Sequence, residues 1–273
     1  MEVLSFASRV SLPEPLPEED YLRLRAKWCN DAEGSLHLED GYGCPLCKNK
    51  GYVMEVRKEE DGARLVTVPC TCEPVRRSIV RMKKSGLEGQ IKACTFDRFR
   101  EETPWQKAMK AEAMAYAQSP EGWFFVGGQS GAGKTHLCTA ICRELLLKGR
   151  EVVYMLWRDE IVRLKGAVTE ADLYTGLIEK YKRAEVLYID DLFKTGKGRD
   201  GQPPLPSAAD VHTAFEILNY RYCNPELLTI LTSELTAEEL LDVDEALAGR
   251  ILERSKTIAI GRDRKKNWRL KGQ

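Results

Sequence analysis

Apolar residues change their spacing along the chain, and this change predicts most of its elements. From Trp123 onward, apolar runs of strand length alternate with stretches that repeat at helical spacing. The runs predict strands at 123–127, 151–156, 185–190, 227–232 and 256–260. Helices are expected at 134–148, 158–165, 170–183, 208–223, 236–241 and 244–254. Alternating strands and helices predict an α/β fold, with a mostly parallel sheet covered by helices on both faces.

The chain before Trp123 has a more varied pattern. Prolines and the lack of a clear period predict a mobile arm at residues 1–16, and Pro17 with the acids after it opens a helix. Short apolar runs at 52–56 and 65–68 predict the two strands of a hairpin. A basic stretch at 76–84 and a further stretch at 105–118 predict helices. The sequence therefore predicts a small domain over 1–93 with a basic linker, and a larger domain over 94–273. A proline-rich segment at 194–207 predicts a mobile surface loop.

Bulk composition narrows the function only a little. The chain has 273 residues, which is one or two domains, and 43% of them are hydrophobic. Its 42 basic and 42 acidic residues cancel, so any contact with nucleic acid must come from a local patch. No 18-residue apolar run and no signal peptide stand out. The sequence therefore predicts a soluble, cytoplasmic protein without a membrane partner.

Residues 128–135 fit the phosphate-binding pattern G-x-x-x-x-G-K-[ST] at every fixed position. A chance glycine-rich turn is the alternative, but a predicted strand before the loop and a predicted helix after it favour a nucleotide site. Lys134 is expected to reach the β- and γ-phosphates of ATP, and the Thr135 hydroxyl to bind Mg²⁺. His136 is included in the site, although local packing is more expected of it than catalysis. The predicted nucleotide ligands in this segment are Gly128, Ser130, Gly131, Ala132, Gly133, Lys134, Thr135 and His136.

Two carboxylates follow the apolar run Val186–Ile189. Asp190 is expected to hold Mg²⁺, directly or through water, and Asp191 to orient and polarise the attacking water. A solvated turn is the alternative. The strand predicted at 227–232 is expected beside the first two, and would place Ser233 as a sensor near the γ-phosphate.

Arg250 and Arg254 are four residues apart and share one face of a predicted helix. One interpretation is an ordinary surface ion pair with Glu253 or another acid. The other is an arginine finger that reaches the ATP of a neighbouring subunit and makes hydrolysis depend on assembly. The sequence does not decide which arginine would have that role.

Four of the nine cysteines form two close pairs, Cys44/Cys47 and Cys70/Cys72, separated by the predicted hairpin. Two thiolate pairs brought together by a hairpin are typical of a tetrahedral Zn²⁺ site. A redox C-x-x-C is the rival, but no βα unit follows Cys47. The other five cysteines fall in apolar patterns and are expected to be buried thiols.

Residues from about 94 to 270 resemble the helicase-loader branch of the AAA+ ATPases, the DnaC/DnaI type, which is similar to the IstB transposition ATPases. The motifs that carry the resemblance are Thr95–Phe99, Gly133–Leu137, Ile189–Leu192, Ile230–Glu234 and Gly249–Arg254. The resemblance implies an AAA+ core with a reduced or absent lid, ATP and Mg²⁺ as ligands, and self-association through the ATPase domain. It also implies a DnaB-type replicative helicase and single-stranded DNA as partners.

The cysteine-containing region resembles the amino-terminal helicase-binding domain of DnaI-like loaders. The basic residues after it form either a solvated helix face or a contact for single-stranded DNA or helicase. One departure is Glu234, where cellular loaders usually have an asparagine, because an ionised carboxylate cannot donate a hydrogen bond to phosphate. Together with the proline-rich loop, Glu234 indicates a loader of phage or mobile-element type. An IstB-like transposition ATPase and a low-turnover nucleotide-binding adaptor remain as alternatives.

Overall fold

The computed structural model of the chain describes residues 16–59, 62–195 and 205–270. The arm predicted at 1–16 lies almost wholly outside these residues, as does most of the loop predicted at 194–207. The described residues form two compact units that divide between Arg76 and Arg77, inside α3 (Glu73–Lys84). This division thus lies earlier than the expected domain boundary at 93/94. Leu87 and Ile91, which precede that boundary, are buried in the core of the larger unit.

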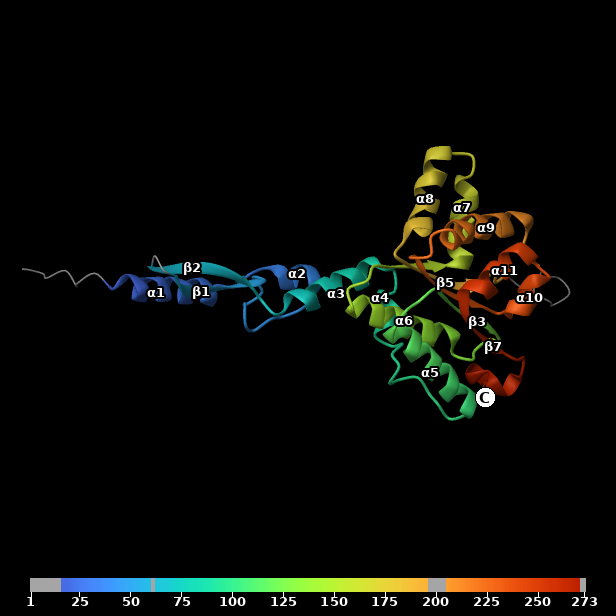
Figure 1. Cartoon of the computed structure of the whole chain (residues 1–273), viewed down its shortest axis with the longest axis horizontal. Helices are drawn as coiled ribbons and strands as arrows, with labels where there is room; N and C mark the ends of the chain where they lie inside the picture. Colours follow the sequence, from blue (N-terminus) through green and yellow to red (C-terminus); the bar gives the residue numbers. More distant parts are fainter. Residues whose placement is uncertain (1–15, 60–61, 196–204, 271–273) are drawn as a thin grey trace, which may run out of the picture. The chain divides into compact units, whose positions relative to one another are not determined.

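Ahead of α3, the described part of the N-terminal unit consists of α-helices and a two-stranded sheet (Figure 1). They are α1 (Glu18–Asp31), α2 (Leu36–Asp40), β1 (Tyr52–Glu59) and β2 (Gly62–Pro69). The antiparallel hairpin pairs Tyr52 with Pro69 at its open end, which confirms the predicted hairpin. Asn30 ties α1 to the sheet, since its side chain bonds both the N–H and the C=O of Met54, at 2.8 and 2.9 Å.

The larger unit is built on a five-stranded parallel sheet. Its strands are β3 (Trp123–Gly128), β4 (Val152–Leu156), β5 (Val186–Leu192), β6 (Leu228–Ser233) and β7 (Ser255–Ile260). Their order in the sheet is β4-β5-β6-β3-β7, so the strand before the phosphate-binding loop lies between β6 and β7. All five expected strands are present, and the parallel sheet is confirmed.

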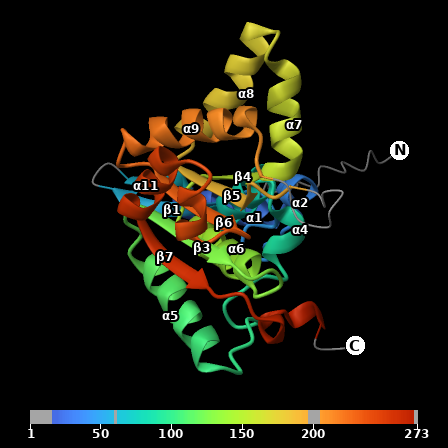
Figure 2. The ribbon, with the colours of Figure 1, turned by 90° about the vertical axis from the view of Figure 1, so that its right-hand side faces the viewer.

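Helices cover both faces of this sheet, as Figure 2 shows. On one face lie α4 (Glu88–Ile91), α5 (Pro104–Gln118) and α6 (Lys134–Leu147). On the other lie α7 (Trp157–Ala167), α8 (Ala171–Arg183), α9 (Ala208–Tyr222), α10 (Ala237–Leu241) and α11 (Glu245–Arg254). Alternation along β3 feeds both cores, because Phe124 and Val126 join the first and Trp123 and Phe125 the second.

The segment after β7 returns to the phosphate-binding loop. It contains two short 3₁₀ helices, η1 (Arg264–Lys266) and η2 (Trp268–Leu270), and no helical lid is found within residues 261–270. Trp268 N–H donates to the carbonyl of Gly131 at 3.0 Å, which fixes this segment against the loop. Across the described ranges, none of the helices combines the length and the apolar character needed to cross a membrane.

Candidate functional site

The predicted phosphate-binding loop joins β3 to α6 at the carboxyl edge of the sheet. The ammonium of Lys134 is buried and donates to the carbonyls of Gly128 and Gln129, at 2.7 and 2.9 Å. Burial lowers the pKa of Lys134, against the nearby charges of Asp191 and Glu234. A charged group kept in a partly desolvated loop is well suited to bind phosphate, because low dielectric strengthens the attraction.

Two glycines of the loop are required by close neighbours as well as by backbone shape. Gly131 and Gly133 have positive φ angles of 72° and 93°. A Cβ at Gly133 would lie 2.7 Å from Cε2 of Phe99, and one at Gly131 would collide with the side chain of Asn267. Both residues therefore let neighbouring segments close on the loop.

Asp190 is buried near the carboxyl end of β5 and is surrounded by hydroxyl groups. Its Oδ1 accepts hydrogen bonds from Thr135 at 2.9 Å, Tyr188 at 2.9 Å and Thr232 at 2.6 Å, and its Oδ2 accepts one from Tyr154 at 3.1 Å. Adjacent oxygen ligands of an octahedral Mg²⁺ are about 3 Å apart, as geometry at about 2.1 Å from the metal requires. The Thr135 and Asp190 oxygens match that spacing, so the pair fits the expected magnesium site.

Asp191 has a left-handed backbone, with φ of 57°, which directs it away from the line of β5. Its N–H donates to Thr232 Oγ1 at 2.8 Å, and its Oδ2 lies 2.7 Å from the ammonium of Lys194. The same ammonium lies 3.2 Å from Glu234 Oε1. Asp191 thus faces the pocket as part of a three-residue charge network.

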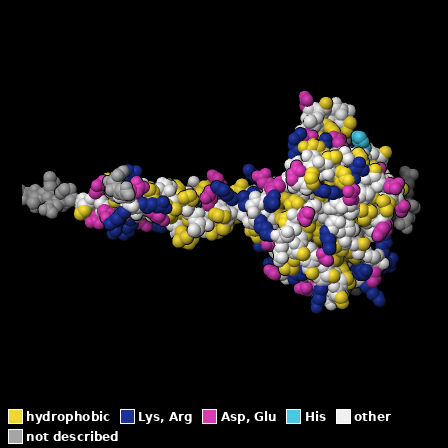
Figure 3. Space-filling model, viewed as in Figure 1, with side chains coloured by type: hydrophobic (Ala, Val, Ile, Leu, Met, Phe, Trp, Pro, Cys, Tyr) yellow, Lys and Arg dark blue, Asp and Glu magenta, His cyan; other side chains and the backbone are white. Residues whose placement is uncertain are grey.

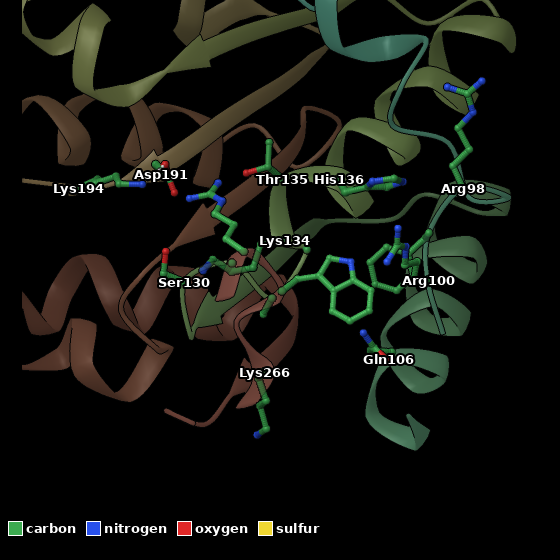
Figure 4. A pocket seen from close by; sticks show the side chains of 16 residues that line it. Arg98, Arg100, Gln106, Ser130, Lys134, Thr135, His136, Asp191, Lys194 and Lys266 are labelled. Atoms are coloured by element: carbon green, nitrogen blue, oxygen red, sulfur yellow. Dashed lines mark hydrogen bonds and ion pairs between the residues drawn. The ribbon is translucent and has the colours of Figure 1, made fainter. Parts of the chain in front are cut away.

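The loop opens onto a pocket of about 340 Å³. Asp191 and Lys194 lie at one end of it, Arg98, Arg100 and Gln106 at the other, and the loop between them (Figure 4). The expected residues that line it are Ser130, Gly131, Ala132, Gly133, Lys134, Thr135, His136 and Asp191. Gly128 and Asp190 lie directly behind this wall, in contact with Lys134 and Thr135.

His136 fixes the segment before α5 onto the loop. Its Nε2 lies 2.8 Å from the carbonyl oxygen of Thr95, and the ring of Phe99 packs edge-on against it with centroids 5.5 Å apart. His136 is thus a lining residue whose ring is held by local contacts, the more expected of its two roles.

Three expected catalytic residues do not line this pocket. Ser233 is fully buried; its hydroxyl donates to the carbonyl of Leu192 at 2.8 Å and accepts from the N–H of Leu235 at 3.1 Å. Because both bonds engage the Ser233 hydroxyl in the turn after β6, its proton is not free to bond a phosphate. The other two, Arg250 and Arg254, lie on α11 away from the pocket.

The two arginines on α11 are held by α9 and its following turn. Arg250 donates to Asn219 Oδ1 at 3.0 Å, and its guanidinium lies 4.8 Å from the ring centroid of Phe215. Arg254 donates to the carbonyl of Pro225 at 3.3 Å. The two arginines do not reach the pocket of their own chain, and only a neighbouring subunit could use them as fingers.

Several lining residues were not predicted. Arg100 and Trp268 stack across the pocket, with the guanidinium 4.7 Å from the indole centroid. Because Arg100 and Trp268 are far apart in sequence, no local pattern predicts their contact. Lys194 had a usable signal, because a basic residue three positions after Asp191 can turn back onto it. The unpredicted lining residues are Arg98, Phe99, Arg100, Gln106, Lys194, Lys266, Trp268 and Arg269.

The cysteine cluster, Cys44, Cys47, Cys70 and Cys72, is buried in the N-terminal unit. All four Sγ atoms lie within 4.8 Å of one another, with Cys44–Cys70 at 3.8 Å and Cys47–Cys72 at 3.7 Å. Ligands in a tetrahedron with Zn–S bonds of about 2.3 Å are about 3.8 Å apart. The cluster therefore fits a four-thiolate zinc site.

Polar groups around the cluster orient it. Arg76 donates to Cys72 Sγ at 3.4 Å, to Asp40 Oδ2 at 2.5 Å and to Asn49 Oδ1 at 3.0 Å. Asn49 also accepts from the N–H of Cys44 at 2.8 Å. Such contacts fix thiolate orientation and offset negative charge, which is the usual arrangement around a metal site.

The remaining cysteines differ in burial. Cys138 and Cys142 on α6 are fully buried, as expected, and burial raises the pKa of both thiols. Cys29 and Cys94 are half-buried. The expectation of burial is wrong for Cys223, which is exposed because it caps the C-terminus of α9, where the helical pattern ends.

Comparison with known proteins identifies the larger unit. The family of IstB-like ATP-binding proteins matches residues 72–268. The phage-like element PBSX protein XkdC of Bacillus subtilis is 34% identical over 226 residues, which cover 78% of this chain and 79% of XkdC. The replicative helicase loader DnaC of Escherichia coli is 28% identical over 113 residues, 40% of this chain and 46% of DnaC.

Solved structures agree on the fold. A crystal structure of the DnaC helicase loader matches with a TM-score of 0.54 and 22% identity, covering 63% of this chain and 99% of that one. At this identity the match supports the AAA+ fold and not a shared activity. With the sheet order, the phosphate-binding loop and the family match in agreement, this chain belongs to the IstB-like ATP-binding proteins, a family with the AAA+ fold of DnaC.

Proposed function

We propose that the protein is an ATPase that loads a replicative DNA helicase of DnaB type onto single-stranded DNA. The observation that carries the ATPase part is the convergence of Lys134, Thr135, Asp190 and Asp191 at one edge of the sheet. The loader part is supported by the relative named as a replicative helicase loader, DnaC. A phage or mobile-element setting is the refinement that the phage-element relative, XkdC, favours.

Each site residue has a proposed task in hydrolysis. Lys134 leaves its two carbonyl acceptors and binds the β- and γ-phosphates. Thr135 and Asp190 would hold Mg²⁺, which would offset the charge of the phosphates. Asp191 accepts a hydrogen bond from the attacking water and so orients it. Positioning and charge stabilisation account for most of the rate in such reactions, which suits a site with few reacting groups.

Self-association is proposed to complete the site. Arg250 and Arg254 lie outside their own pocket, so one of them would act on the ATP of a neighbouring subunit. Mixing a Lys134→Ala chain with an arginine-to-alanine chain tests this, because a mixed interface can combine an intact pocket with an intact finger. Recovery of hydrolysis is expected in the mixture, and its absence with both single variants inactive would contradict a shared site.

The two units are proposed to divide the partners. The zinc-binding N-terminal unit, held by Cys44, Cys47, Cys70 and Cys72, would bind the helicase, and the ATPase unit would bind single-stranded DNA. The whole chain has no net charge, so DNA affinity is expected to be modest and to fall with salt.

The decisive experiment is co-purification of the full chain with the replicative helicase of the same genome or its host. Helicase capture and ATP hydrolysis stimulated by single-stranded DNA are the expected results. Capture of a transposase instead would favour an IstB-like role. Binding of ATP without measurable hydrolysis would favour a low-turnover adaptor. A chain beginning at residue 77 should lose helicase binding and keep ATP binding.

A further inference from the structure

Lys194 brings a second ammonium group to the nucleotide pocket, at the same end as Asp191 (Figure 4). A turn closed by the bond from Lys194 N–H to the carbonyl of Asp191, at 2.9 Å, folds the side chain back. Its Nζ then lies 2.7 Å from Asp191 Oδ2 and 3.2 Å from Glu234 Oε1. A cation therefore lies beside the carboxylate proposed to orient the attacking water.

Core contacts hold this turn in place. Phe193 is buried and packs edge-on against Trp157, with centroids 5.5 Å apart. The carbonyl of Leu192 accepts from the buried hydroxyl of Ser233. Lys194 therefore follows two anchored residues, and its position in the pocket is set by the fold.

Glu234 connects Lys194 to the phosphate-binding loop. Partial burial raises the pKa of Glu234, but its hydrogen bond with Ser130 and the charge of Lys194 lower it overall. Burial likewise lowers the pKa of Lys194, but Asp191 and Glu234 raise it overall. Both groups stay charged near neutral pH, so the pair supplies a fixed cation beside the loop.

The carboxylate at position 234 explains why Lys194 would be needed as a hydrogen-bond donor. An ionised carboxylate cannot donate a hydrogen bond to the terminal phosphate, whereas an ammonium group has three N–H donors. With Asp191 in its proposed role, the Lys194 ammonium, 2.7 Å from that carboxylate, would lie near the phosphorus that the oriented water attacks. Glu234 thus positions the ammonium of Lys194, which is the donor, and does not donate a hydrogen bond itself.

We propose that Lys194 is a catalytic cation that contacts the terminal phosphate of ATP bound to its own subunit, and that Glu234 is the positioning residue that holds it. This inference rests on the proposed ATPase function. In the step, the water oxygen forms a bond to the γ-phosphorus while the bond to the β–γ bridging oxygen breaks. The bridging oxygen keeps the electron pair and leaves with ADP, and a water proton passes to Asp191 and then to solvent. Lys194 keeps its protons and offsets the charge on the phosphate oxygens.

The test compares the full chain with its Lys194→Met and Lys194→Arg variants in single-turnover hydrolysis with Mg²⁺. Lys194→Met is expected to lower the rate by about 100-fold, the usual loss for one electrostatic donor. It should leave ADP affinity unchanged and weaken the binding of ADP with aluminium fluoride, which mimics the transferred phosphate. Lys194→Arg should keep part of the rate. Lys256→Met is the matched control, because Lys256 pairs with Glu112 at 3.0 Å outside the pocket and should change neither quantity.

Glu234→Gln separates positioning from general stabilisation. It should lower the rate less than Lys194→Met, and add no further loss in the double variant, because both changes act through one contact. A Lys194→Met protein that hydrolyses ATP as fast as the parent, or faster because Asp191 is released, would overturn the inference while the ATPase assignment stands. A parent chain that binds no ATP would instead overturn the proposed function.

Discussion

In the N-terminal unit, the buried apolar side chains of the described residues are Ala26 and the four cysteines of the cluster. In the ATPase unit, both faces of the sheet carry a core with fully buried phenylalanine, leucine and isoleucine, and the second core also buries Trp123. The small unit instead exposes large apolar groups on α1, with Trp28 77% exposed, and apolar side chains are visible among charged ones on its surface (Figure 3). A unit that buries so few apolar side chains gains little stability from packing, so a metal would have to supply most of its folding energy.

Removal of the metal should have the largest effect on the difference in stability between the two units. Structural zinc contributes about 10–16 kcal/mol in small domains, far more than the N-terminal unit could replace by packing. A chelator should therefore unfold residues 16–76 and leave the ATPase unit folded. Hydrogen exchange of the intact chain, followed by mass spectrometry, would show protection lost only in the first unit. The expectation fails if the purified chain holds no zinc, or if protection there survives the chelator.

Two tryptophans provide a matched pair for packing. Trp123 in β3 is fully buried, and Trp123→Ala should lower the free energy of unfolding of the ATPase unit by about 3–5 kcal/mol. Trp28→Ala should change the stability of its own unit by less than about 0.5 kcal/mol, because the ring is already in water. Chemical denaturation of both variants measures the difference. Equal losses would mean that α1 is covered in solution.

Substitutions in the nucleotide site should affect the ATPase unit and leave the N-terminal unit unchanged. Lys134→Ala removes the buried ammonium of the phosphate-binding loop and should weaken ATP binding by about 100-fold, or about 2.7 kcal/mol. Asp191→Asn should bind ATP nearly as well as the parent but stop hydrolysis. Neither change should alter the zinc content of the N-terminal unit. Titration with a fluorescent ATP analogue measures the first effect, and normal binding and turnover in both variants would contradict the site.

Acid should give the smallest effect in the ATPase unit. Partial burial raises the pKa values of Glu160 and Glu216, but hydrogen bonds from Tyr181 and Lys182 respectively lower them overall. Their contribution is present above the unfolded pKa near 4.5 and is lost as pH falls through the folded values. The side chains of Glu160 and Glu216 are 20% and 29% exposed, so water still screens these contacts and the loss is small. Thermal melting between neutral pH and pH 4 should therefore show zinc release and melting of the N-terminal unit first. Loss of the ATPase unit before the metal would reverse the proposed order.

Most of the fold could be predicted because it follows local periodicity. All five strands of the sheet and the hairpin of the N-terminal unit lie where apolar runs placed them. Short elements without a period were not found: α2, α4 and the two 3₁₀ helices have too few residues to show one. The division at Arg76/Arg77 was also missed, because the packing of Leu87 and Ile91 against α6 leaves no mark in their own sequence.

By itself the sequence determined the phosphate-binding loop, the acids Asp190 and Asp191, and the cysteine cluster, because each is a short motif whose spacing records its geometry. Only the tertiary structure decided the partners of these groups. The order β5-β6-β3 brings Thr232 to Asp190, and the turn after β5 brings Lys194 between Asp191 and Glu234. Arg221, which reads as an ordinary polar position in α9, is fully buried and donates to the carbonyls of Tyr181, Lys182, Ala184 and Leu228. Such contacts depend on which strands and helices become neighbours, and that choice is made by packing of the whole sheet rather than by any local pattern.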